Sequence, residues 1–183
     1  MADLKAAVNP LFLREEELRQ GIDLLFFVRR DLGAVTDEAL AAEGLGRAHH
    51  RALMALARRP KLAVGDLLAL LRVRKQSLAR VVKELQAQGL VQQSRGTADR
   101  RQRMLELTER GRSLEESLAA AQRTRLAQAY REAGAEAVEG FRTVMLGLIE
   151  PADRKRLAEA FARERQAMAR AGGPVPARLP RRG

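Results

Sequence analysis

The stretch that most limits how this chain can fold runs from residue 72 to residue 103, RVRKQSLARVVKELQAQGLVQQSRGTADRRQR. In its first half, Leu78, Val82 and Leu85 recur at helical spacing, and basic or polar side chains occupy the opposite face. Gly89 follows at the place of a helix C-terminal cap, and two short runs with strand character then flank a basic turn. The pattern predicts a helix packed on a core, followed by a β-hairpin.

The residues before this stretch complete a helix-turn-helix. The run VGDLLALL, residues 64 to 71, predicts a short helix that ends a few residues before the basic helix. Local capping is weak, because Ala63 and Arg74 stand where Ser, Thr or Asp is favoured, and Arg72 occupies the turn where Gly is easiest. We therefore expect tertiary packing to stabilise a winged helix-turn-helix lobe.

The remainder of the chain predicts a mostly α protein with a small β-hairpin wing. Aromatic residues make up only 3% of the 183 residues, and Ala, Leu, Arg, Glu and Gln dominate. We expect one domain over residues 1 to 171, in which residues 45 to 111 form the winged helix-turn-helix. A flexible basic tail is expected at residues 172 to 183, where glycines and prolines gather. Further helices are expected at residues 14 to 42, 47 to 58, 108 to 133, 135 to 149 and 152 to 170.

Positive charge is concentrated where a polyanion would bind. The formal net charge is +11, and residues 72 to 103 hold nine Lys or Arg against two acidic residues, Glu84 and Asp99. The tail from Arg170 adds four arginines, and the rest of the chain is balanced. A surplus confined to one helix and hairpin favours a nucleic-acid footprint over a general solubility device, although a solvated basic face is the alternative.

Each part of the basic stretch suits a different groove of double-stranded DNA. A helix fits the major groove, where Arg can bind guanine and Gln adenine. An Arg on a narrow hairpin can enter the minor groove, and Asp99 stands two residues from Arg101, close enough to orient it. The residues predicted to bind DNA from the helix are Arg74, Lys75, Gln76, Ser77, Arg80 and Lys83, and those from the wing are Arg95, Asp99, Arg100, Arg101 and Arg103.

The run GLVQQSRGTADRRQRMLELTERG, residues 89 to 111, resembles the MarR family of bacterial regulators, whose wing carries Asp-x-Arg, Leu-x-Leu-Thr and a Gly. The matching residues are Asp99, Arg101, Leu105, Leu107, Thr108 and Gly111. The run KQSLARVVKELQAQG is similar to the PetP-like branch of that family. The resemblance implies a homodimer formed by residues 14 to 43 and 112 to 170 and a pseudo-palindromic operator with half-sites about one helical turn apart. Many members of the family also carry a pocket for a small-molecule effector, which the resemblance extends to this chain as an expected partner.

Other function classes find less support in the residues. There is no cysteine, no phosphate-binding loop and no Ser/His/Asp arrangement, so we expect neither an enzyme nor a cofactor. His49 and His50 are adjacent and point about 100° apart on a helix, which disfavours a metal site and favours packing or pH sensitivity. A winged-helix adaptor or an RNA-binding module is the alternative function. Without a signal-peptide pattern or a long apolar run, we expect a cytoplasmic protein and no membrane partner.

Overall fold

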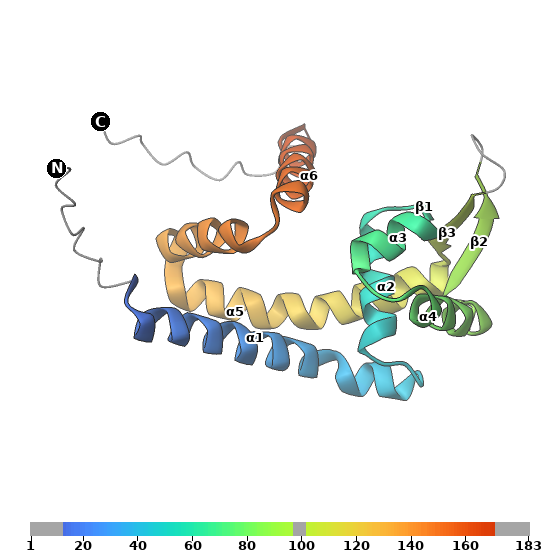
Figure 1. The fold of residues 1–183 in the computed structure, drawn as a ribbon, viewed down its shortest axis with the longest axis horizontal. Helices are drawn as coiled ribbons and strands as arrows, with labels where there is room; N and C mark the ends of the chain where they lie inside the picture. Colours follow the sequence, from blue (N-terminus) through green and yellow to red (C-terminus); the bar gives the residue numbers. More distant parts are fainter. Residues whose placement is uncertain (1–12, 97–101, 171–183) are drawn as a thin grey trace, which may run out of the picture. The chain divides into compact units, whose positions relative to one another are not determined.

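The computed structural model describes residues 13–96 and 102–170, and it divides into two compact units, residues 1–128 and 129–183. The helices are α1 (Glu15–Ala42), α2 (Arg47–Arg58), α3 (Val64–Leu71), α4 (Lys75–Ala87), α5 (Glu109–Leu148) and α6 (Pro151–Arg170). The strands are β1 (Leu62–Ala63), β2 (Val91–Arg95) and β3 (Arg103–Leu107) (Figure 1). No helix within the described ranges is long and apolar enough to cross a membrane.

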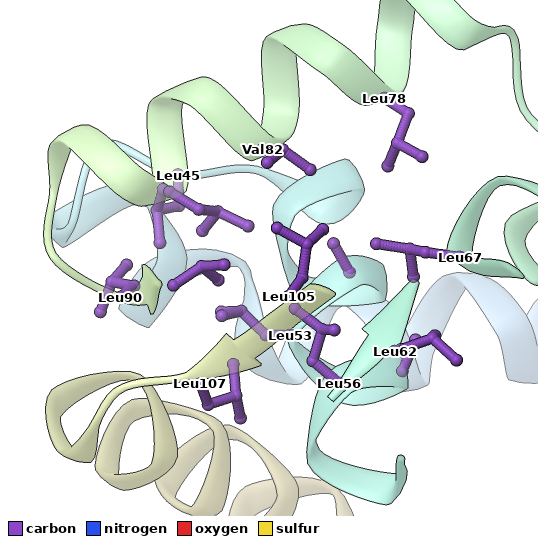
Figure 2. Close-up of a cluster of buried hydrophobic side chains, with 14 of the residues drawn as sticks. Leu45, Leu53, Leu56, Leu62, Leu67, Leu78, Val82, Leu90, Leu105 and Leu107 are labelled. Atoms are coloured by element: carbon purple, nitrogen blue, oxygen red, sulfur yellow. The ribbon is translucent and has the colours of Figure 1, made fainter. Parts of the chain in front are cut away.

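The core of the first unit is built almost entirely from leucines and alanines of short elements. Leu105 of β3 is fully buried near the centre of the cluster, with Leu53 and Leu56 of α2 close beside it (Figure 2). Leu78, Val82 and Leu85 of α4 close one side of this core, as their helical spacing predicts. Burying one such leucine stabilises the lobe by roughly 1.5 to 3 kcal/mol. This burial replaces the local caps that the sequence lacks, because Ala63 and Arg74 make no side-chain capping bond.

The hairpin belongs to a three-stranded antiparallel sheet in the order β1-β3-β2. Strands β2 and β3 pair from Val91 with Leu107 to Arg95 with Arg103, and β1 adds Leu62 opposite Leu105. The sequence predicted strands over residues 90 to 95 and 103 to 108, each one residue longer than β2 and β3 at the base of the hairpin, and it did not predict β1. The fold class is otherwise as predicted. Arg72, which stands in the turn between α3 and α4 where glycine is easiest, adopts a left-handed conformation (φ 50°).

Two further features concern the long helices. In the first unit, α1 buries only Thr36 and Leu40, and its N-terminal two thirds exposes large apolar side chains, with Ile22 67% and Phe26 64% exposed. The second unit contains Gly134, whose φ of 81° and ψ of 168° interrupt α5 at the residue where the sequence predicted a break. The predicted single domain stays a prediction, and the predicted tail, residues 172 to 183, lies outside the described residues.

Candidate nucleic-acid interface

One face of α4 is free of contacts with the core and carries the predicted recognition residues. All six are exposed, namely Arg74, Lys75, Gln76, Ser77, Arg80 and Lys83. Among the described residues, no ion pair holds Arg74, Lys75 or Lys83, so these three cations are open to an external anion. The opposed apolar stripe of the same helix is buried, which fixes which face points outward.

Arg80 differs from its basic neighbours because a carboxylate holds it. Its Nε donates to Oε1 of Glu84 at 2.8 Å, one turn further along α4. Oε2 of Glu84 lies 2.7 Å from Nε2 of His49 on α2. The Arg80 hydrogen bond, and after it the His49 hydrogen bond, lower the pKa of Glu84 below its usual value. Sequence reasoning missed this chain of contacts, since it treated Glu84 only as a charge to be counted.

The hairpin places two cations opposite each other. Arg95 and Arg103 form the outermost β2–β3 pair within the described residues, and both side chains are exposed. Like charges directly across an antiparallel pair destabilise it, so an anion beside them would relieve a repulsion built into the hairpin. The other predicted wing residues, Asp99, Arg100 and Arg101, lie outside the described residues.

The junction of α4, β2 and α5 holds the hairpin base against the helix. Thr108 caps α5, because its Oγ1 accepts from the Gly111 amide at 3.0 Å and donates to the Gly89 carbonyl at 2.6 Å. Arg110 adds bonds to the Gln88 carbonyl at 2.6 Å and to Glu43 at 2.8 Å. A Cβ on Gly111 would lie 2.0 Å from the Leu90 carbonyl oxygen, so this close approach requires glycine. Because threonine is favoured at helix N-caps, the sequence predicts Thr108 as the cap of the helix expected from residue 108, and the bond from Gly111 confirms it.

The first unit also contains a buried histidine, His50, and a separate cavity among its helices. His50 is 7% exposed, and burial lowers its pKa, opposed by the charge of Asp37. A cavity of about 260 Å³ opens between α1, α2 and α5, and it is lined by Leu32, Met54, Arg58, Glu115, Ala119, Gln122, Arg123 and Leu126. No group of three His, Asp or Glu side chains suited to a metal ion occurs in residues 13–96 or 102–170.

Comparison with known proteins decides the family. A sequence model described as MarR family matches residues 43–102, which cover the helix-turn-helix and β2 and end just before β3. The HTH-type transcriptional regulator PetP of Rhodobacter capsulatus is 47% identical over 145 residues, which is 79% of this chain and 87% of that protein. This chain belongs to the MarR family. It is a helix-turn-helix transcription regulator of MarR type, and members of this family are DNA-binding regulators, not enzymes.

Solved structures of the family share the fold. A MarR family regulator from Silicibacter pomeroyi is 25% identical with a TM-score of 0.59, over 70% of this chain and 88% of that one. A mutant of MarR from E. coli, solved in complex with operator DNA, is 20% identical with a TM-score of 0.58, over 76% of this chain and 99% of that one. The winged helix-turn-helix predicted from the sequence is therefore the family's fold.

Proposed function

We propose that this chain binds a pseudo-palindromic DNA operator as a homodimer, with α4 in the major groove and the β2–β3 hairpin in the minor groove of each half-site. The observation that carries the proposal is the exposed basic face of α4, which is continuous in sequence with a hairpin that pairs Arg95 with Arg103. The operator complex of the E. coli relative supports a duplex DNA partner. Half-sites about one helical turn apart follow from two copies on one face of the duplex.

Roles divide according to what each side chain can reach. We assign base contacts to Gln76, Ser77 and Arg80, whose amide, hydroxyl and guanidinium groups can match base edges. Arg74, Lys75 and Lys83 are assigned to phosphates, which set the register of the helix without reading sequence. The wing residues assigned to the minor groove and its phosphates are Arg95, Arg100, Arg101 and Arg103, with Asp99 orienting Arg101.

Arg80→Ala tests the assignment most directly. Loss of a base contact is expected to weaken operator binding by about 1 to 3 kcal/mol while binding to random DNA changes little. Arg19→Ala is the matched control, because Arg19 is also exposed and also pairs with a glutamate four residues away, Glu15 at 3.1 Å, but lies on α1. Fluorescence anisotropy with operator and scrambled duplexes measures both affinities. Equal losses in the two variants contradict the role given to Arg80.

The same titrations separate DNA binding from the alternative functions. Specific binding is expected to survive competitor DNA and to weaken with salt in proportion to the phosphates engaged. An RNA module would bind a structured RNA of equal length at least as tightly. An adaptor would show no preference among duplexes. Either result would replace operator recognition as the function.

We propose that the apolar face of α1 forms part of the dimer interface. Leu18, Ile22 and Leu25 lie on one stripe at helical spacing, and all three are exposed large apolar side chains. Apolar patches of this kind on soluble proteins mark interaction surfaces. Ile22→Asp is expected to give monomers in light scattering after size exclusion, while Gln20→Asp on the same helix leaves the dimer intact. A dimer that survives Ile22→Asp at micromolar concentration would remove α1 from the interface.

The small-molecule effector stays a prediction, and the cavity between α1, α2 and α5 is where such a ligand would fit.

A further inference from the structure

Glu84 joins the proposed recognition helix to the body of the lobe through a chain of three side chains. Arg80 donates from Nε to Oε1 of Glu84 at 2.8 Å, and Oε2 of the same carboxylate lies 2.7 Å from Nε2 of His49. His49 is held at its other nitrogen, since the Gly46 amide donates to Nδ1 at 3.0 Å. Both carboxylate oxygens are thus engaged, and each bond fixes one side chain relative to the next.

The bond from Gly46 decides how the imidazole meets Glu84. An amide N–H requires an acceptor at Nδ1, so the ring proton of neutral His49 stands on Nε2 and points at the carboxylate. The His49 side chain is only 14% exposed, whereas that of Arg80 is 81% exposed. The rigid end of the chain is therefore in α2, and its free end is the guanidinium that faces solvent.

A carboxylate on a DNA-facing helix repels phosphate, so Glu84 cannot contribute to binding by charge attraction and must act in another way. An arginine side chain loses much rotamer freedom when it docks, and a partner that fixes it beforehand reduces that loss. Donation to Glu84 uses only Nε of Arg80 and leaves its two terminal nitrogens for a forked contact to a base edge.

We propose that Glu84, anchored by His49, is a positioning residue that presents Arg80 to DNA in one orientation and thereby sets specificity at one base pair of each half-site. This inference rests on the proposed function, because it requires Arg80 to contact a base. It adds two residues, His49 and Glu84, to those that determine which operator is chosen.

The test compares affinities for the operator and for its complete set of single-base variants. Glu84→Gln is expected to reduce discrimination at the Arg80 position by about fivefold, the lower end of what one base contact contributes, and to leave other positions unchanged. In an Arg80→Ala background the same substitution is expected to change no position. Glu109→Gln is the control for charge alone, because Glu109 also pairs with an arginine, Arg112 at 3.2 Å, but lies at the start of α5.

Two substitutions of His49 test the anchor without touching the charge of Glu84. His49→Ala is expected to reproduce the local loss of Glu84→Gln. His49→Gln is expected to restore discrimination, because a glutamine three residues after the N-cap can accept from the Gly46 amide and still donate to Glu84. Melting curves of all variants show whether the lobe stays folded, and Glu84→Gln, at a side chain 38% exposed, serves if His49→Ala does not fold.

The outcomes are distinct. A loss confined to one base pair, absent without Arg80 and restored by His49→Gln, supports the positioning role. A uniform change at all base pairs, like that of Glu109→Gln, or no change at all, overturns it. If the unmodified protein shows no preference among duplexes, the proposed function is wrong and this inference fails with it, whereas a uniform effect of Glu84→Gln on a protein that does discriminate overturns the inference alone.

Discussion

Thr108→Val is expected to loosen the junction between the hairpin and α5 while preserving its shape. Valine matches threonine in volume and branching, so the substitution removes the hydroxyl and little else. That hydroxyl accepts from the Gly111 amide at 3.0 Å and donates to the Gly89 carbonyl at 2.6 Å. Loss of an N-cap costs about 1 kcal/mol, and loss of the second hydrogen bond costs a similar amount. The expected fall in the free energy of unfolding is therefore about 2 kcal/mol.

Urea denaturation followed by circular dichroism measures this change, and thermal melting should show a fall in Tm of about 4 to 8 °C for a chain of this size. Protein concentration must be equal in all samples, since an associating protein gains stability with concentration. Thr124→Val is the matched control, because Thr124 is exposed in the interior of α5 and its hydroxyl donates to the Ala120 carbonyl of the preceding turn, away from the junction. If the two variants lose the same stability, the capping argument fails.

Three further predictions concern the same lobe. Gly111→Ala is expected to destabilise the protein by more than about 2 kcal/mol, because the added Cβ would lie 2.0 Å from the Leu90 carbonyl oxygen. Gly65→Ala is the control: a Cβ there has no heavy atom of another residue within 4 Å, so the urea midpoint should change little or rise. Leu105→Ala, at a fully buried position in the central strand, is expected to cost about 2 to 5 kcal/mol in the same assay, and a loss under 1 kcal/mol would contradict its place in the core. The pKa of His50 is lowered in the folded state, so as pH falls through about 6.5 the unfolded chain takes up a proton before the folded protein does, and stability declines. His50→Gln should therefore flatten the dependence of Tm on pH between about pH 7.5 and 5.5. An unchanged slope would mean that another group titrates.

Elements with strong apolar periodicity could be predicted from the sequence alone. The bounds of α2 and α3 match the expected ranges, and α4 begins after Arg74 and ends before Gly89, as expected. The buried leucines at helical spacing outweigh the missing caps at Ala63 and Arg74. The break at Gly134 was also predictable, since its φ of 81° is a conformation that other residues rarely adopt. Strand β1 was not, because two residues carry no periodic signal and its only support is the pairing with β3.

The proposed DNA interface was likewise predictable from the sequence only in part. The exposed face of α4 follows directly from the positions of its apolar residues, and each predicted recognition residue is exposed. The contact between His49 and Glu84 joins residues 35 apart in the chain, and nothing in the local sequence of either residue indicates it. Tertiary contacts between polar side chains depend on where whole helices lie, so they require the structure. The predicted bond between Asp99 and Arg101 stays a prediction.

The two-residue strand β1 has a consequence for which duplexes the lobe can accept. Strand β3 is held on one side by β1, next to α3, and on the other by β2, which follows α4 through Gly89 and Leu90. Helix α4 and the base of the hairpin therefore form one stiff body, and the separation between their outer faces is preset. A nucleic acid whose grooves are spaced differently, such as an A-form RNA–DNA hybrid, would meet the helix or the hairpin but not both. Selection for the B-form would then come from the dimensions of the protein, before any base is contacted.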